Sequence, residues 1–127
     1  MNETFYAILG VKLGKWYIGY GCFPAEGSPT FVEAKASDVL KWHKLLIATW
    51  HSHPNMPALA SRTDKDTMIG LANSVGRDLL CLIDGKDTLQ AYITSTNPEC
   101  MLDNVDDMYL LDCKIHRKGN WFFIYVR

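Results

Sequence analysis

The residues best suited to chemistry form a short run, His51-Ser52-His53-Pro54, that follows an apolar stretch. Residues two apart in an extended chain point to the same side, so the imidazoles of His51 and His53 can converge on one point. Pro54 cannot continue a strand because it lacks a backbone N–H, which places the pair at the end of a strand. Neutral imidazole nitrogens at about 2.0–2.1 Å are ordinary zinc ligands. The run therefore predicts two ligands of a metal site.

A third ligand must come from elsewhere, and Asp64 is the best-placed carboxylate. It follows His51 by thirteen residues, at the predicted start of a helix and beyond a loop that can fold back. Two imidazoles and one carboxylate leave a fourth tetrahedral position for water, which is typical of a catalytic rather than a structural zinc. Ser61 precedes Asp64 by three residues, and its hydroxyl could donate a hydrogen bond to an oxyanion beside the metal. The proton of the water needs a base, for which a carboxylate is the natural choice, but the spacing leaves open which one.

Each of these residues also has an ordinary structural interpretation. A histidine at a strand end is commonly satisfied by backbone or solvent, Ser61 could be a loop or near-cap serine, and Asp64 could simply cap a helix. Capping and metal ligation would then compete for the same carboxylate oxygens. For either histidine alone, the structural interpretation would be favoured over metal binding.

The same residues resemble the metal-binding signature of the JAMM (MPN+) metalloproteases, in which H-x-H-P is followed at fixed spacing by S-x-x-D. The signature positions are occupied by His51, His53, Pro54, Ser61 and Asp64. The glutamate of that family usually opens a strand of the form E-x-x-G-x-L-x-G. Residues 3–10 keep the glutamate and the final glycine but have Tyr6 at the inner glycine position. The resemblance extends through about residue 94.

The resemblance implies a set of catalytic roles. It implies that the two histidines and Asp64 bind one Zn²⁺ per chain, and that Ser61 stabilises the tetrahedral intermediate. It also implies that Glu3 acts as the general base and then as the general acid toward the departing amine. Glu33, on a possible short strand, is the alternative base.

The resemblance also implies a function and a fold. The function is that of a zinc-dependent metalloprotease or isopeptidase that cuts a peptide or isopeptide bond after the tail of a ubiquitin-like or sulfur-carrier protein. The fold is the MPN/JAB architecture, which is similar to that of cytidine deaminases. The alternative is a non-catalytic MPN-type module that mediates protein–protein contacts. Relatives of that kind usually lose a metal ligand, whereas all three are present here.

The elements that must position these residues are strands interrupted by two helices. Strands are predicted over residues 3–11, 15–23, 30–33, 45–50, 79–83, 89–94, 109–115 and 121–126. Two helices are predicted, the first capped by Ser37 or Asp38 and the second capped by Thr63 or Asp64 and ending at Gly76. This order predicts an α/β layer structure in which helices flank a single mixed β-sheet. Because residues 45–50 and 79–83 are apolar on both faces, helices are expected to cover both sides.

Composition and length bound the remaining possibilities. The chain has 127 residues, of which 48% are hydrophobic, so one ordered domain spanning residues 1–127 is expected. Thirteen Lys and Arg against fourteen Asp and Glu argue against a generally basic nucleic-acid binder, though not against a local basic patch. The expected partner is a protein or peptide substrate, with no nucleic acid and no membrane. Four cysteines without a C-x-x-C pair, and no visible secretory signal, predict reduced thiols in a cytoplasmic protein.

Overall fold

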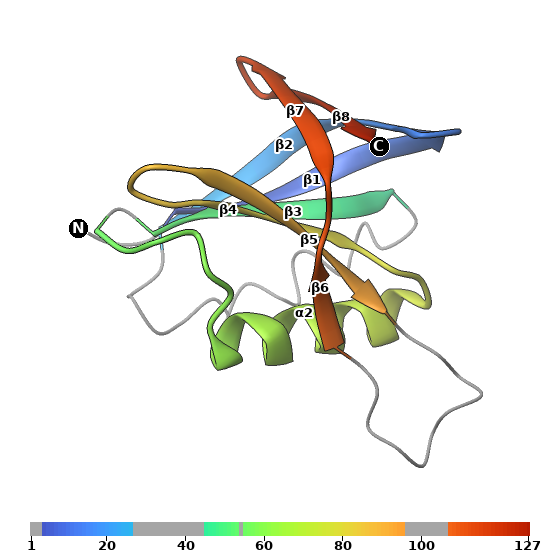
Figure 1. The fold of residues 1–127 in the computed structure, drawn as a ribbon. Helices are drawn as coiled ribbons and strands as arrows, with labels where there is room; N and C mark the ends of the chain where they lie inside the picture. Colours follow the sequence, from blue (N-terminus) through green and yellow to red (C-terminus); the bar gives the residue numbers. More distant parts are fainter. Residues whose placement is uncertain (1–3, 27–44, 54, 96–106) are drawn as a thin grey trace.

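The sheet that carries the candidate metal ligands has eight strands. The computed structural model describes residues 4–26, 45–53, 55–95 and 107–127, shown in colour in Figure 1. In chain order, the strands and the helix of the described residues are β1 (Thr4–Leu13), β2 (Trp16–Glu26), β3 (Leu46–Ser52), α2 (Arg62–Val75), β4 (Leu80–Asp84), β5 (Leu89–Ser95), β6 (Asp107–Leu110), β7 (Cys113–Lys118) and β8 (Trp121–Val126). The strand order across the sheet is β6-β5-β4-β3-β1-β2-β8-β7. Only the β3–β4 pair is parallel among these strands, so the sheet is mixed.

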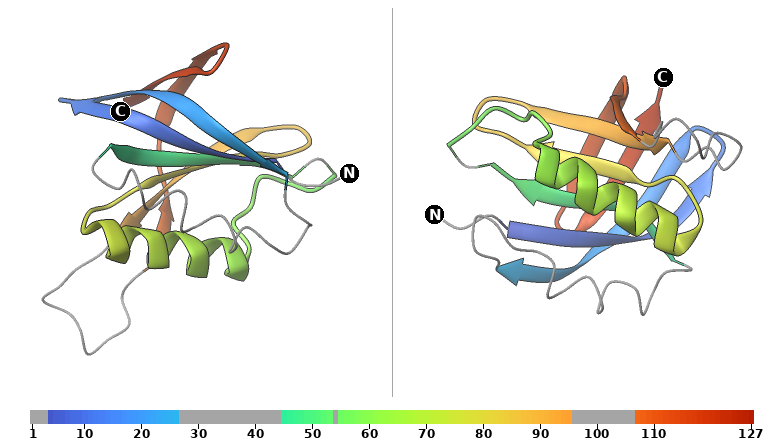
Figure 2. Two further views of the ribbon diagram at one scale, coloured as in Figure 1. Left: turned by 180° about the vertical axis from the view of Figure 1, so that it is seen from behind. Right: turned by 90° about the horizontal axis from the view of Figure 1, so that it is seen from below.

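The predicted α/β fold with helices flanking the sheet is wrong. Within the part of the chain that the structure describes, strands dominate and α2 is the single helix. It lies against one side of the sheet, while β7 and β8 lie on the other (Figure 1 and Figure 2). The sheet curls, so that apolar side chains of its own two halves meet on the inner side. Strands β3 and β4 are buried on both faces because α2 covers one face and the curled sheet covers the other.

The two faces of the sheet support two apolar clusters. The cluster on the helix side packs Met68, Leu71 and Ala72 of α2 against strand residues such as Phe5 and Ile83. The cluster inside the curl collects larger side chains. Its buried members are Ile8, Tyr17, Ile47, Ala48, Trp50, Leu80, Leu82, Ala91, Phe122 and Ile124. Burial of this second cluster needs no helix, because the outer strands supply the cover.

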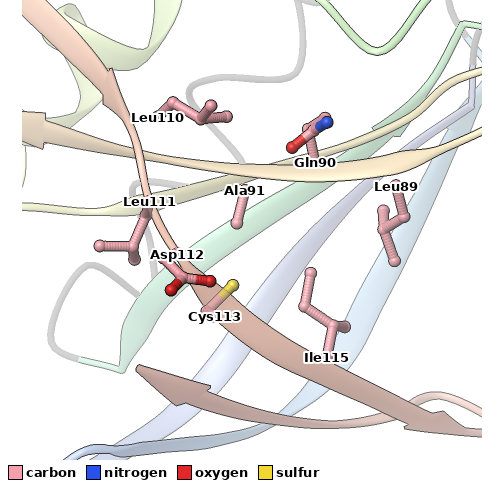
Figure 3. Close-up of a pocket in the computed structure, with 8 residues that line it drawn as sticks. All are labelled: Leu89, Gln90, Ala91, Leu110, Leu111, Asp112, Cys113 and Ile115. Carbon is pink, nitrogen blue, oxygen red and sulfur yellow. The ribbon is translucent and has the colours of Figure 1, made fainter. Parts of the chain in front are cut away.

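Strands β6 and β7, near the C-terminal end of the chain, differ most from the prediction. Residues 109–115 were expected to form one strand, but the chain divides there into β6 and β7, which lie at opposite edges of the sheet. Leu111 and Asp112 join the two, and Leu111 N–H donates to the carbonyl of Ala91 at 2.8 Å. A two-residue link between opposite edges is possible only because the curl brings the edges close. Side chains of β5, β7 and the link line a cavity of about 280 Å³ at this place (Figure 3).

Other predicted elements are confirmed. Gly14 lies in the tight turn between β1 and β2 with a φ of 59°, a conformation that glycine adopts without strain. The strands predicted over residues 45–50, 79–83 and 89–94 are β3, β4 and β5, the last two forming an antiparallel pair. The helix and the strand predicted near Ser37 and over residues 30–33 lie outside the described residues, as does Glu33. No helix in the described ranges is both long enough and apolar enough to cross a membrane.

Candidate metal site

Strand β3 places two imidazoles on the side of the sheet that faces α2. His51 is held between two strands, because β1 pairs Phe5 with it on one side and β4 pairs Ile83 with it on the other. His53 lies just beyond the strand, and its N–H still donates to the carbonyl of Asp84 at 2.8 Å. Both histidines are buried. Their placement at the end of a strand, on one side, agrees with the sequence prediction.

The ligand atoms of His51, His53 and Asp64 converge. The two Nε2 atoms lie 3.1 Å apart, His51 Nε2 lies 3.2 Å from Asp64 Oδ1, and His53 Nε2 lies 3.3 Å from Asp64 Oδ2. Ligands about 2.0–2.1 Å from a tetrahedral zinc are separated by roughly 3.3–3.4 Å. The three residues therefore form a group that could hold a metal ion, as the sequence predicted.

A backbone carbonyl fixes the orientation of the His53 ring. His53 Nδ1 lies 3.2 Å from the carbonyl oxygen of Pro57. A carbonyl only accepts hydrogen bonds, so Nδ1 carries the proton and Nε2 presents its lone pair to the cluster. Metal-binding histidines commonly donate their second ring nitrogen to a carbonyl or carboxylate in this way. The loop after β3 therefore prepares His53 as a ligand.

Asp64 is held by the first turn of α2. Ser61 is the N-cap, and its Oγ accepts from Asp64 N–H at 3.1 Å, while Asp64 Oδ2 accepts from Ser61 N–H at 2.9 Å. This reciprocal pair is a capping box. The prediction that Thr63 or Asp64 caps the helix is therefore wrong by two or three residues. The S-x-x-D spacing that resembles the metalloprotease signature is also a helix-start signal, which would have identified Ser61 as the cap.

Capping and ligation do not exclude each other at Asp64. Its Oδ2 accepts the backbone hydrogen bond, while Oδ1 faces His51. An ionised carboxylate has about four lone-pair positions, enough for the cap and a metal. The helix N-terminus also favours the negative charge of this side chain. Ser61 is exposed. Its hydroxyl oxygen accepts the hydrogen bond from Asp64 N–H, so its hydroxyl hydrogen is still able to donate. The predicted role of Ser61 in stabilising an oxyanion stays a prediction.

Burial and hydrogen bonding act in opposite directions on His51. Burial alone would lower its pKa, but hydrogen bonds and charge interactions with Asp64 and Cys81 raise the pKa to about 10. Burial would raise the pKa of Asp64, yet the interactions with His51 and Ser61 lower it to about 2. At neutral pH and without metal, an imidazolium therefore faces a carboxylate. A bound metal ion must replace the proton of His51.

We expect metal binding at neutral pH to release about one proton per ion and to tighten about tenfold per pH unit while His51 is protonated. Calorimetric titration in two buffers of different ionisation enthalpy measures the released protons. Without metal, the stabilisation from His51 is complete below pH 6.5 and is lost as the pH rises through about 10. That from Asp64 is complete above pH 3.8 and is lost as the pH falls through about 2. Binding at pH 7 without proton release would contradict this assignment.

Cys81 is the residue that sequence reasoning missed. It is fully buried on β4 and its side chain hydrogen-bonds that of His51. From the sequence, Cys81 is predicted only to be a reduced thiol. Its place beside the site comes from the β3–β4 register, which pairs Cys81 with Thr49, two residues before His51. No local spacing in the sequence indicates that pairing.

The two predicted general bases are not among the residues that the structure describes. Glu3 and Glu33, like Pro54, lie outside the described residues. The described part of β1 begins at Thr4, immediately after Glu3 in sequence. Over the ranges that the structure covers, the group of possible metal ligands consists of the two histidines and Asp64.

Comparison with known proteins adds no assignment. The sequence matches no model of a known protein family and no curated protein.

Proposed function

We propose that this protein is a zinc-dependent metallopeptidase that hydrolyses a peptide or isopeptide bond. The observation that carries the proposal is the convergence of His51, His53 and Asp64 at 3.1–3.3 Å, with each side chain held by a second interaction. Those interactions come from Cys81, the carbonyl of Pro57 and the backbone of Ser61. Three protein ligands with a prepared orientation are typical of catalytic metal sites, which keep the fourth position for water or substrate.

The donor set favours zinc over harder cations. Mg²⁺ and Ca²⁺ prefer all-oxygen surroundings, whereas two imidazole nitrogens and one carboxylate suit Zn²⁺. Partial burial of Asp64 and full burial of the histidines limit the access of water to the ligands. A zinc ion held here would supply Lewis-acid chemistry, polarising a carbonyl group and lowering the pKa of a water molecule.

The side chains around the metal would divide the remaining work. Ser61, at the N-terminus of α2, would donate its hydroxyl hydrogen to the oxygen that develops negative charge. Glu3 would accept a proton from the attacking water and pass it to the departing amine. Support for Glu3 over Glu33 comes from its neighbours, because β1 begins one residue later and pairs Phe5 with His51. The proposed substrate, the tail of a ubiquitin-like or sulfur-carrier protein, rests on the resemblance of the motif.

Metal analysis and a cleavage assay together test this function. Purified protein should contain about one zinc per chain by mass spectrometry, and it should cut a fusion of ubiquitin to a C-terminal reporter peptide. Glu3→Gln should retain zinc but lose about 10²–10⁴-fold in rate, as expected for the loss of a general base. Glu33→Gln is the matched control and should keep full activity.

Each result separates the alternatives. Protein prepared without chelators that contains no zinc would overturn the metallopeptidase proposal. An active Glu3→Gln variant beside an inactive Glu33→Gln variant would show that Glu33, rather than Glu3, is the general base. Stoichiometric zinc without cleavage of the fusion would favour the non-catalytic interaction module.

A further inference from the structure

One side of the β1-β2-β8-β7 half of the sheet forms a block of exposed and half-buried side chains that are mainly apolar and basic, here called the aromatic face. The strand registers place its members in rows across the four strands. The rows are Leu13-Trp16-Tyr125-Lys114, Val11-Ile18-Phe123-His116 and Leu9-Tyr20-Trp121-Lys118. Directly opposed residues of paired strands share a side of the sheet, so all twelve side chains point the same way.

The aromatic face is open to solvent. Trp16, Tyr20 and Trp121 are 44%, 41% and 50% exposed, whereas the alternate residues Tyr17 and Phe122 are buried inside the curl. Helix α2 packs against β5 and β6, on the other half of the sheet. A strand with one solvated face normally places polar residues on it. An exposed block of this composition marks an interaction surface.

Charge in this half of the sheet is strongly biased. The described side chains of residues 5–21 and 112–127 include six Lys or Arg and one acidic residue, Asp112. Lys114 and Lys118, together with His116, form one column of the aromatic face along the edge strand β7. Since the whole chain has a net charge of −1, the remainder of the molecule compensates for this basic region. Lys12 and Arg117 lie over rings of the cluster inside the curl, so the cations that the aromatic face itself presents are Lys114, Lys118 and Arg127. These three cations make the face complementary to a polyanion.

A hollow on the aromatic face combines rings and cations. It has a volume of about 550 Å³ and is lined by Trp16, Tyr125, Lys114 and Arg127. The two ring centroids lie 5.0 Å apart, and the second ring pair, Tyr20 with Trp121, has a centroid distance of 5.2 Å. The guanidinium of Arg127 forms an exposed ion pair with Asp112 at 3.7 Å, and its backbone N–H donates to the carbonyl of Asp112 at 3.1 Å. Flat apolar surfaces beside exposed cations match a ligand that is both aromatic and anionic.

We propose that the aromatic face binds single-stranded nucleic acid. Bases stack on Trp16, Tyr20 and Trp121, and phosphates lie along the basic column that includes Lys114 and Lys118. This combination of stacking rings with a positively charged track is the one that single-strand binding proteins use. A duplex hides the faces of its bases, so it could use only the cations.

The geometry favours a polymer over the other possible occupants. Trp16 and Tyr20 are four residues apart on β2, about 13 Å, so a single nucleotide covers one ring pair and a strand of several nucleotides covers both. Protein interfaces are depleted in lysine at their centre, whereas two of the three residues in the column along β7 are lysines. The inference is independent of the metal site, because its residues come from other strands.

Fluorescence anisotropy tests the proposal with labelled 20-nucleotide oligo-dT and oligo-U, a duplex of equal length, and AMP as competitor. The protein should bind both single strands more tightly than the duplex, with an affinity that falls as salt rises. Trp16→Ala and Trp121→Ala should each weaken binding by about fivefold or more, and Trp121→Phe should restore it. Lys118→Glu should reduce the slope of log affinity against log salt by about one.

Matched controls lie on the other half of the sheet. Tyr109 on β6 is 48% exposed and Lys86 is an exposed lysine, so Tyr109→Ala and Lys86→Glu should leave binding unchanged. Equal losses in these controls, or no binding at low salt, would overturn the proposal. So would AMP competing as tightly as the polymer binds. A wild-type dimer that Trp121→Ala disperses in sedimentation would identify the face as a contact between protein copies instead.

Discussion

Asp64→Asn is expected to abolish tight zinc binding and peptidase activity while α2 still forms. The amide oxygen of asparagine can accept the hydrogen bond from Ser61 N–H as the carboxylate does, so the capping box is largely retained. A neutral amide, however, does not supply the negative charge that the carboxylate of Asp64 would offer to zinc. Loss of an outer partner of a ligand costs about 10–100-fold in metal affinity, and loss of a ligand itself should exceed that range.

Ser61→Ala is the matched variant because it removes the cap and keeps the ligand. The Ser61 hydroxyl accepts from Asp64 N–H at 3.1 Å, and replacing an N-cap serine by alanine costs about 0.5–2 kcal/mol of stability. We therefore expect Ser61→Ala to lower the free energy of unfolding and to retain zinc. Zinc content, zinc affinity by competition with a chelating dye, and urea unfolding measure both variants. If Asp64→Asn retained stoichiometric zinc, the carboxylate would be a cap only, and the third ligand would come from elsewhere.

The candidate metal site could be predicted because its determinants are local. His51 and His53 need only the alternation of an extended chain to share a side, and the strand is confirmed. Asp64 needs only the start of a helix, and the S-x-x-D spacing forms its own capping box. Short-range geometry thus determines how each ligand is presented. The distances between the ligands also require the loop of residues 55–60, whose path the sequence does not specify.

The curl of the sheet could not be predicted in the same way. Apolar strands buried on both faces indicate that something covers each face, but not whether a helix or another part of the sheet does so. Residues 109–115 read as one strand because Tyr109, Leu110 and Leu111 continue an apolar run. The break before β7 arises from pairing with β8 at the far edge. The aromatic face has the same origin, since residues of β2 and β8 that are about a hundred positions apart become neighbours.

The loop between His53 and Ser61 is fixed against the β4–β5 turn. Lys86 N–H donates to the carbonyl of Met56 at 2.9 Å, and the hydroxyl of Tyr92 donates to the carbonyl of Ala58 at 3.1 Å. The closest approach is at Gly85, where a Cβ would lie 2.4 Å from the backbone nitrogen of Ala58. Backbone atoms cannot yield as a flexible side chain can. Any side chain at position 85 must therefore displace the loop.

Gly85→Ala is accordingly expected to weaken zinc binding as well as the fold. Overpacking of this kind costs about 1–3 kcal/mol, measured by urea unfolding of the metal-free protein. Displacement of the loop also moves the carbonyl of Pro57 away from His53 Nδ1, which should lower zinc affinity by about tenfold or more. A smaller change of the same kind is expected for Tyr92→Phe, which removes the hydroxyl that holds Ala58.

Gly70→Ala separates the effect on zinc from a general effect of replacing glycine. Gly70 lies inside α2, and a Cβ there would meet no atom within 4 Å. Alanine in a helix interior is favoured over glycine by about 0.5–1 kcal/mol, so this variant should be slightly more stable with unchanged zinc affinity. A Gly85→Ala protein that loses stability but binds zinc like the wild type would show that the loop does not orient His53. The His53 imidazole would then be oriented by β3 and Asp64, and the carbonyl of Pro57 would not contribute to its orientation.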